Sequence, residues 1–537
     1  MSESIMLINP PVHLDRQIVQ PLGIASIAGQ LRRAGYSSIS IVDGCYLVKK
    51  HGYERSFQII REELERTRPF IVGCTLHSSM LEETERICEV AFKVNSHVVI
   101  GGHGATACHE VSAMDFYARA RACNSSSITA VVRGEGEETA KQLVDALSQR
   151  RTLYGIQGVT FHNGNRVVVN PGRALLDMNT LEPPAMDLLP RADEYGGWFN
   201  IEESRGCVFH CSFCSIRGMY PVARLKDPER IRIEVEQARR LGAEKVYLTG
   251  ELTLLDIGRA IAISDIMRSY GLQWSTSAHP SLISKAKSIL PALKSSGLVC
   301  LEVGIEAGSQ RSLDVFNKGT TPKKNRLAMR ILEREGIAQW LHFIPFHPYM
   351  NMRDLYENVM FMTRNMANFL GRPNYPDYLS HAWVPTEGTA LFERARKDGL
   401  ITRRGGKEYV RYEDRRVIEA KRSYDHFFLK KHGEEYHRLH SELIKMIDTM
   451  NPEDLRENEN KKFMLIGTLP LSVLYVAYAC ALTGVPAQER LECLVGRFFK
   501  AIQSENSDIS YLDLCSSVLE GIEESQAESH AHKQSSQ

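Results

Sequence analysis

The sequence has almost no net charge and no framework of paired cysteines. Its 66 lysine and arginine residues balance 65 aspartate and glutamate residues, which leaves a formal net charge of +1 at pH 7. A chain with so little charge has no overall field that attracts nucleic acid or an anionic membrane, so neither is expected as a partner. The twelve cysteines show no regular spacing outside one loop, and the first residues lack the basic and apolar regions of a signal peptide. Both observations favour a reducing, cytoplasmic location.

Long uncharged runs are scarce as well. One stretch, Phe463 to Gly484, approaches the length that crosses a membrane. It contains Gly467, Pro470 and three serine or threonine residues, which favour a buried helix or two short helices over a membrane span.

The first 150 residues alternate short apolar segments with helical patterns. Strands are expected at 5–8, 39–42, 70–73, 98–100 and 129–132, with helices at 22–34, 54–66, 81–93 and up to about 148. Five strands joined by crossover helices predict a doubly wound parallel α/β sheet. Ligands of such sheets bind beyond the carboxyl ends of the strands.

Glycines lie at those ends, at Gly44, Gly101, Gly102, Gly134 and Gly136. Glycine lets the backbone approach a bulky ligand closely. The first strand is not followed by G-x-G-x-x-G, which argues against a dinucleotide as that ligand.

The rest of the chain divides into four further parts. A hairpin with an Asn163-Gly164 turn precedes a proline-rich linker at 181–190, which marks a domain boundary. Strands expected at 199–202, 245–248, 273–277, 299–303, 339–344 and 379–384 alternate with helices, as in a partial (β/α)6 barrel. The expected units are 1–152, the hairpin and linker 153–192, the barrel 193–404, a mainly helical region 405–523, and a disordered polar tail 524–537.

One loop carries the most specific signal of the sequence. Cys207, Cys211 and Cys214 have the spacing C-x3-C-x2-C, which can direct three thiolates at one [4Fe–4S] cluster. Three ligands leave the fourth iron open, as a catalytic metal requires. The alternative is zinc, which needs four ligands; no second cysteine pair follows, and His210 lies inside the loop.

This loop, with the preceding Ser204-Arg205-Gly206 and the aromatic Phe213, resembles that of the radical S-adenosylmethionine (SAM) enzymes. The resemblance implies that the open iron binds SAM and that cluster reduction cleaves SAM to a 5′-deoxyadenosyl radical. Residues at the ends of the following strands resemble the SAM-binding motifs of that superfamily. The expected SAM contacts are Phe213, Gly250, Glu251, Ser277, Glu306, Ser309 and Ile344.

Four histidines, His279, His342, His347 and His381, are placed by the pattern at the mouth of the expected barrel. Each is either a structural or substrate-polarity residue or a proton carrier in catalysis.

The N-terminal unit resembles the cobalamin-binding domain that precedes many radical SAM domains. Asn9-Pro10-Pro11, Gly101-Gly102-His103 and Arg133–Glu137 carry this resemblance. It implies cobalamin contacts at Asp43, Gly44, Gly101, Gly102, His103, Gly134 and Glu135. The D-x-H-x-x-G motif is absent, so the lower cobalt ligand is unassigned; His103 is a candidate, or it bonds within its loop or touches the corrin edge. A sheet that only serves as a scaffold is the alternative for the whole unit.

Together these motifs resemble the cobalamin-binding radical SAM superfamily, of the class B methyltransferase type. The implied activity is methylation of an unactivated carbon or phosphorus of a small-molecule biosynthetic intermediate, with an external electron donor such as flavodoxin or ferredoxin. Oxidative cyclisation, ring contraction or rearrangement without methyl transfer is an alternative with the same cofactors. A non-catalytic iron–sulfur electron-transfer or sensor protein is an alternative of another class.

Overall fold

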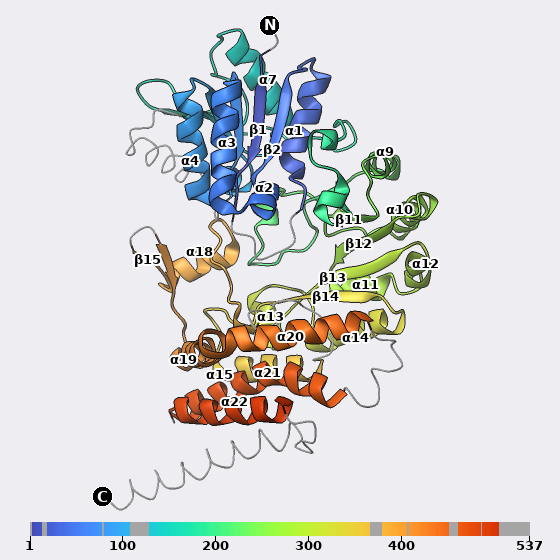
Figure 1. Cartoon of the computed structure of the whole chain (residues 1–537), viewed down its shortest axis with the longest axis vertical. Coiled ribbons are helices and arrows are strands. Elements are labelled where there is room, and N and C mark those ends of the chain that lie inside the picture. The colour runs from blue at the N-terminus through green and yellow to red at the C-terminus, as the bar shows by residue number, and fades with distance from the viewer. Residues whose placement is uncertain are drawn as a thin grey trace, which may run out of the picture.

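The computed structural model describes residues 3–12, 19–77, 80–107, 128–365, 379–404, 407–449, 460–484 and 486–503. Figure 1 shows these residues in three tiers along the long axis of the molecule. A sheet with helices on both faces lies at the N-terminal end, a second sheet follows in the middle, and a layer of helices lies at the other end. The tail at 524–537, expected to be disordered, lies outside the described residues.

The first sheet has seven strands in the order β2-β1-β3-β4-β5-β6-β7. These are β1 (Ile5–Asn9), β2 (Ile39–Asp43), β3 (Ile71–Thr75), β4 (His97–Gly101), β5 (Ile128–Val132), β6 (Val159–His162) and β7 (Val167–Val169). The first five pair in parallel, as the alternating pattern predicted. The hairpin strands β6 and β7 pair antiparallel and continue this sheet beyond β5.

Amphipathic helices cover both faces of the first sheet, which confirms the doubly wound arrangement. On one face α1 (Leu22–Arg33) and α7 (Glu137–Ser148) pack apolar side chains against β1 and β3. On the other face α3 (Tyr53–Thr67) and α4 (Leu81–Lys93) do the same. Two short helices, α2 (Gly44–His51) and α5 (His103–Ala107), directly follow β2 and β4.

The proline-rich linker lies along α1 on its way to the second sheet. The backbone nitrogen of Ala185 donates to the carbonyl of Ala25 (2.9 Å), and a side chain at Gly29 would meet the carbonyl of Pro183 at 2.4 Å. Gln20 donates to the carbonyl of Trp198 (2.7 Å), at the start of the second sheet. The two sheets are therefore joined by packed contacts as well as by the chain.

The second sheet has five parallel strands in the order β14-β13-β12-β11-β8. These are β8 (Trp198–Glu202), β11 (Lys245–Thr249), β12 (Gln273–Ala278), β13 (Leu298–Glu306) and β14 (Ala338–Phe343). The surrounding helices are α9 (Pro228–Arg240), α10 (Ile257–Ser269), α11 (Pro280–Lys285), α12 (Leu290–Ser295), α13 (Gln310–Val315) and α14 (Pro322–Arg334). Proline at the start of α9, α11 and α14 and a side-chain cap from Asp256 on α10 fix where these helices begin.

The sixth barrel strand, expected at 379–384, is reduced to a single parallel bridge between Ala382 and Phe346. The backbone nitrogen of Trp383 donates to the carbonyl of Phe346 (2.7 Å). Pro345 and Pro348 flank this position, and proline has no N–H to extend a ladder. The prediction of six full strands was wrong for this reason.

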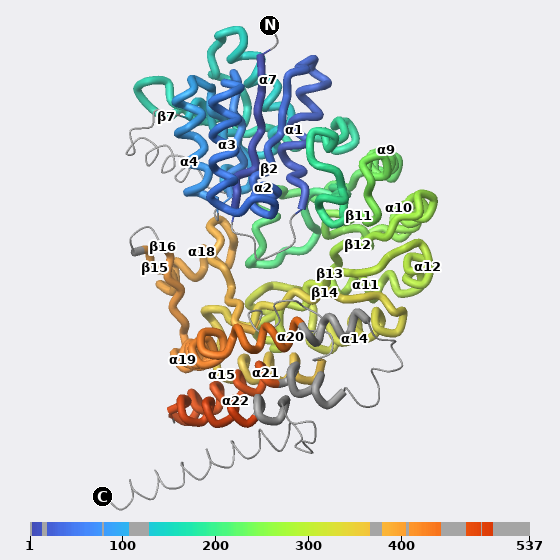
Figure 2. The backbone as a smooth tube through the Cα atoms, in the orientation of Figure 1, coloured from blue at the N-terminus to red at the C-terminus, as the bar shows by residue number. Residues whose placement is uncertain are grey.

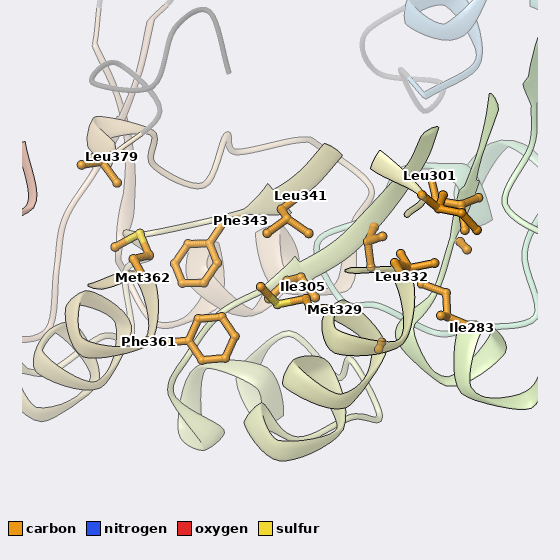
Figure 3. Packing of buried hydrophobic residues seen from close by; sticks show 14 of the residues in the cluster. Ile283, Leu301, Ile305, Met329, Leu332, Leu341, Phe343, Phe361, Met362 and Leu379 are labelled. Carbon is orange, nitrogen blue, oxygen red and sulfur yellow. The ribbon is translucent and has the colours of Figure 1, made fainter. Parts of the chain in front are cut away.

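A layer of helices packs beneath the second sheet (Figure 2). These are α15 (Met352–Arg364), α19 (Arg415–Tyr424), a π-helix at Asp425–Lys430, α20 (Lys431–Thr449), α21 (Asn460–Thr483) and α22 (Gln488–Gln503). The helix α18 (Ala390–Lys397) and the hairpin of β15 (Ile401–Arg404) and β16 (Lys407–Val410) lie to one side, nearer the first sheet (Figure 2). Figure 3 shows Phe343 of β14 facing Phe361 of α15, with ring centroids 6.1 Å apart. The same apolar core continues into α21, which contains the uncharged stretch. In the described ranges, no helix has both the length and the apolar character needed to cross a bilayer.

Candidate functional site

The three cysteines lie on a loop that leaves the carboxyl end of β8. The loop begins at β9 (Ser204–Arg205), includes α8 (Ile216–Met219) and returns through β10 (Arg224–Leu225). β9 and β10 pair antiparallel and close the loop at its base. Cys207, Cys211 and Cys214 are each half-buried, so their thiols are within reach of a group held inside the loop.

Aromatic and backbone contacts hold this loop against the end of the second sheet. The ring of Phe209 stacks on that of His279, with centroids 3.8 Å apart and planes 17° apart. The ring of Phe213 meets Phe316 edge-on at 5.3 Å. The nitrogen of Ser212 donates to the carbonyl of Phe316 (2.8 Å), and the spacing of the cysteines is thereby fixed from both sides.

Burial raises the pKa of all three thiols, that of Cys211 to about 11, while the nearby charge of Lys318 lowers them. The thiols are therefore protonated at neutral pH until a metal displaces the protons. In the described part of the chain, no three His, Cys, Asp or Glu side chains lie close enough to hold one metal ion. A [4Fe–4S] cluster would take one thiolate on each of three irons.

Lys318 lies at the centre of the site and was not singled out by the sequence. Its ammonium is buried and pairs with the carboxylate of Glu306 at 3.0 Å. Glu306 ends β13 with a φ of +63°, a conformation that is uncommon for a residue with a side chain. A side chain at Gly304 would lie 2.5 Å from both the Glu306 carboxylate and the Lys318 ammonium. The Gly-Ile-Glu motif therefore makes room for this ion pair.

Gly250 and Glu251 follow β11 and lie against the start of the cluster loop. A side chain at Gly250, whose φ is +150°, would meet the hydroxyl of Ser204 at 2.3 Å and the carboxylate of Glu203 at 2.5 Å. This close approach places Glu251 beside the loop. The Glu251 carboxylate keeps accessible surface, but the surrounding protein raises its pKa by burial, while Lys318 lowers it.

Three carboxylates surround this space, from Glu251, Glu302 and Glu306. The described cations among the groups that act on Glu251 are Lys318 and, when protonated, His342. An excess of negative charge fits the ammonium group of SAM, because opposite charges in a partly buried place attract strongly. The residues present therefore fit a cluster with SAM bound to it.

The other expected SAM contacts are distributed around this centre. The hydroxyl of Ser277 lies 3.0 Å from that of Tyr247, on the open face of the sheet. The hydroxyl of Ser309 caps α13 and donates to the carboxylate of Asp354 (2.7 Å), so its hydrogen bonds are made within the protein. Ile344 packs against the same apolar cluster as Phe213 and donates its N–H to the carbonyl of Glu306 (2.8 Å).

The inner face of the second sheet carries side chains with accessible surface. They include Tyr247 of β11, Glu302 of β13, and Trp340 and His342 of β14, which alternate along their strands with buried residues of the core. His342 Nε2 and the Glu302 carboxylate are 3.0 Å apart. This face adjoins Glu251, whose pKa responds to both residues.

The histidines differ in position. His342 lies on the open face, and His381 is exposed. His279 is buried under Phe209, and burial followed by the charge of Lys318 lowers its pKa to about 4. His347 is fully buried, bonds the hydroxyl of Ser312 (2.9 Å), and has a pKa of about 3 because of burial. Its expected place at the mouth of the barrel was wrong, because the Pro345–Pro348 turn directs it into the core.

An apolar cavity of about 210 Å³ opens at the carboxyl end of the first sheet. Gly101, Gly102, Gly134 and Glu135 line it, as do apolar side chains of α1 and α7. A side chain at Gly102, with a φ of +100°, would lie 3.2 Å from the carbonyl of Leu76. The backbone is therefore drawn close to the cavity, as binding of a bulky flat ligand requires.

The cavity also reaches the cluster loop. Glu202, Arg205 and Tyr220 of the second unit complete its lining. Nearby, α5 of the first unit packs against α8, the helix that follows the cysteines. The chain thus places the glycine-lined edge of one sheet next to the cysteine loop of the other, and the residues present fit cobalamin beside a cluster.

Three expected cobalamin contacts lie outside the lining of this cavity. The buried carboxylate of Asp43 accepts from Asn9 (2.9 Å), Cys45 (3.1 Å) and Tyr195 (2.8 Å). A side chain at Gly44 would lie 2.4 Å from the nitrogen of Pro11, so this glycine permits packing of the strand end. His103 begins α5, and burial lowers its pKa, which keeps the imidazole neutral.

Two family models match the chain. The radical SAM superfamily model matches residues 201–362, and the B12 binding domain model matches residues 14–144. The chain is 29% identical over 423 residues to an uncharacterized methyltransferase, PH0819, of Pyrococcus horikoshii, which covers 76% of this chain and 86% of that protein. It is 28% identical to the anaerobic magnesium-protoporphyrin IX monomethyl ester cyclase of Rubrivivax gelatinosus, covering 60% of this chain and 58% of that one. It is 27% identical to the hopanoid C-3 methylase of Methylococcus capsulatus, covering 61% of each.

Solved structures share the fold. The cobalamin-dependent SAM radical enzyme OxsB, with aqua-cobalamin and SAM bound, superposes with a TM-score of 0.73 at 16% identity, covering 98% of this chain and 80% of that one. The radical SAM methyltransferase TsrM from Kitasatospora setae gives a TM-score of 0.54 at 18% identity, covering 68% and 71%. With both family models in the order that the motifs predicted, the chain carries a B12-binding domain followed by a radical SAM domain, and these domains imply a [4Fe–4S] cluster, SAM and cobalamin as cofactors.

Proposed function

We propose that this enzyme transfers a methyl group from SAM to an unactivated carbon, or phosphorus, of a small-molecule biosynthetic intermediate. The observation that carries the proposal is the shared wall of the two cofactor sites. Arg205 and Tyr220 line the cavity of the first unit, and both belong to the loop that carries the cysteines. A methyl donor and a radical source can act on one carbon only if both are held within reach of it.

Different residues of the chain would hold the three cofactors. Cys207, Cys211 and Cys214 would hold the cluster, and Glu251 and the Glu306–Lys318 pair would bind the charged groups of SAM. Gly101, Gly102 and Gly134 would lie against the corrin, and the apolar cavity behind them would take the remaining part of cobalamin. When bound, the cluster with SAM supplies the means to remove a hydrogen atom, and cobalamin supplies a methyl group that an unactivated carbon accepts.

The inner face of the second sheet is the proposed wall of the substrate site. Trp340 offers an apolar surface, and the paired Glu302 and His342 offer a carboxylate and an imidazole for hydrogen bonding. This wall adjoins Glu251 and the cluster loop, so a substrate held there would place a carbon near the radical source.

Relatives support this reading. PH0819 and the hopanoid C-3 methylase carry methylation in their names, and TsrM is a methyltransferase of the same fold. Other relatives, the magnesium-protoporphyrin cyclase and 4′-phospho-dehydrooxetanocin synthase, are named for other products. A radical reaction without methyl transfer, such as a cyclisation or ring contraction, is therefore the second candidate.

The stoichiometry of SAM consumption separates the two. Replacement of a hydrogen by a methyl group would consume two SAM molecules and two electrons from an external donor such as flavodoxin or ferredoxin. It would release one S-adenosylhomocysteine, one methionine and one 5′-deoxyadenosine for each methylated product. The anaerobic enzyme with all three cofactors, incubated with the small-molecule extract of its cells and methyl-labelled SAM, should form the two adenosyl products in equal amounts and a labelled product.

5′-Deoxyadenosine without S-adenosylhomocysteine or label would contradict methyl transfer and favour the second candidate. Cys211→Ala should abolish the formation of 5′-deoxyadenosine. Wild-type protein that forms none would favour a non-catalytic cluster protein.

A further inference from the structure

Two arginines close the base of the cluster loop and reach into the N-terminal unit. Arg205 and Arg224 are opposite one another in the β9–β10 ladder. Arg205 donates through Nη2 to the carboxylate of Glu137 (2.5 Å) and through Nε to that of Glu202 (3.0 Å). Arg224 donates through Nη1 to the carboxylate of Glu135 (3.0 Å), which also lies 3.3 Å from Arg205 Nη1. Glu135 and Glu137 come from the loop and first helical residue that follow β5.

We call Glu135, Glu137, Glu202, Arg205 and Arg224 the arginine–glutamate cluster; three of its side chains are almost fully buried, while Arg224 and Glu202 are partly exposed. The side chains of Arg205, Glu135 and Glu137 are 5%, 2% and 6% exposed. Burial alone would raise the pKa of Glu135, but hydrogen bonds from Arg224 and Leu176 and the charge of Arg205 together lower it. The carboxylate is therefore ionised and depends on both arginines.

The same cluster forms part of the cavity wall. Glu135, Glu137, Glu202 and Arg205 all line the cavity at the edge of the first sheet. Arg205 is also two residues before Cys207, with only Gly206 between them, and the φ of Gly206 is +78°. A side chain at Gly206 would meet the carbonyl of Val222 at 2.5 Å, so the turn into the cysteines is tightly packed. A displacement of Arg205 would therefore move the first cluster ligand.

We propose that Arg205 is a positioning residue that couples the two cofactor sites, so that cobalamin binding and an ordered cluster loop strengthen each other. The Arg205 guanidinium is planar with its N–H donors in fixed directions, and it donates to Glu137 of the first unit and Glu202 of the second at once. Cobalamin bound in the cavity would restrain the Arg205 guanidinium because Arg205 lines the cavity. A cluster bound to Cys207 would restrain the same residue through the chain. The coupling concerns the cofactor sites and holds for either reaction considered for this enzyme.

The test measures cobalamin affinity with and without the cluster. Full-length protein, either loaded with the [4Fe–4S] cluster or free of iron, is titrated anaerobically with hydroxocobalamin, and binding is followed by the corrin absorption. Coupling between two sites typically amounts to five- to 150-fold. The cluster-loaded wild type should bind cobalamin about tenfold more tightly than the cluster-free wild type. Because coupling free energy is reciprocal, cobalamin should also tighten retention of iron against a chelator.

Variants distinguish coupling from direct contact. Glu137→Gln removes a charge but keeps the shape of the side chain, and should bring the ratio of the two affinities close to one. Arg205→Lys keeps the charge but loses the planar guanidinium, and should give an intermediate ratio. The control is Glu234→Gln, which breaks the Lys226–Glu234 pair (2.5 Å, 7% and 4% exposed). That pair is buried in the same way but lies within the barrel unit.

The ratio separates the possible outcomes. A variant that only weakens cobalamin contacts, or only loosens the fold, lowers both affinities and leaves their ratio near that of the wild type. A reduced ratio in Glu137→Gln with an unchanged ratio in Glu234→Gln would support the coupling. A wild-type ratio of one, or an undiminished ratio in both Glu137→Gln and Arg205→Lys, would overturn it. If Glu137→Gln does not fold, the ratio measured for Arg205→Lys decides the matter in its place.

Discussion

His279 links the pH dependence of stability to the cluster loop. Its Nδ1 accepts from the backbone nitrogen of Ser281 (3.2 Å) at the start of α11, and its Nε2 lies 3.0 Å from the carbonyl of Lys318. These partners assign the ring proton to Nε2, with Nδ1 as an acceptor. Protonation of Nδ1 would remove the helix cap and place a second cation beside Lys318. The ring also stacks on Phe209, between two of the cluster cysteines.

The magnitude follows from the shift of the pKa from its ordinary value of 6.5 to about 4, caused first by burial and then by the charge of Lys318. A shift of this size corresponds to about 3 kcal/mol. The pKa is lowered, so the folded protein favours the neutral ring. The stabilisation is therefore complete above pH 6.5 and is lost as the pH falls towards 4.

His279→Asn tests this magnitude, because asparagine can cap α11 but does not titrate. Thermal midpoints of the cofactor-free wild type and variant are measured by circular dichroism from pH 4 to 8. The wild type should be the more stable above pH 6.5, and its advantage should shrink by roughly 3 °C towards pH 4, at about 1 °C per kcal/mol for a chain of 537 residues that unfolds as one unit. Other titrating groups cancel in the difference. A difference that stays constant over this pH range would refute the reasoning.

Two further predictions concern the same site. Gly250→Ala should weaken SAM binding at least about tenfold and lower the thermal midpoint, because the new methyl group would meet Ser204 and Glu203 at a backbone conformation that favours glycine. Calorimetric titration with SAM measures the affinity. The control is Gly218→Ala, whose new methyl group meets no atom within 4 Å. Equal affinities of the two variants would contradict the role given to Gly250. In the cluster-free protein, the rate at which iodoacetamide alkylates Cys211 should reach half of its maximum near pH 11, because burial raises the pKa of this thiol. The exposed Cys493 serves as the reference thiol. A half-maximal rate for Cys211 near pH 8.5 would contradict the burial of its thiol.

Much of the fold could be predicted from the sequence because its signals are local. Short apolar runs that alternate with helical patterns predicted the five parallel strands of the first sheet in the correct order along the chain. The spacing of Cys207, Cys211 and Cys214 is likewise a property of one short segment. The sixth barrel strand failed because Pro345 and Pro348 interrupt the pairing that its apolar residues suggested.

The centre of the site could be predicted only in part, because the ion-pair and hydrogen-bond partners of its residues are brought together by tertiary packing. Glu306 was expected from its motif, but its partner Lys318 lies in an ordinary turn after α13, and no spacing connects the two. Glu135 was expected to touch cobalamin, and the structure adds two arginines of the other unit, one of them far from any motif. Asp43 also ends a strand as expected, but Tyr195, 152 residues further along, bonds its carboxylate.

Cofactor content tests the central claim most directly. The protein is purified anaerobically, its iron and corrin are quantified, and its absorption spectrum is recorded beside that of the Cys207→Ala/Cys211→Ala/Cys214→Ala variant. The wild type should contain about four iron atoms and one cobalamin per chain, and the variant should lose the iron and retain the cobalamin less tightly. Iron without cobalamin binding, or a variant that keeps its full iron content, would contradict the account.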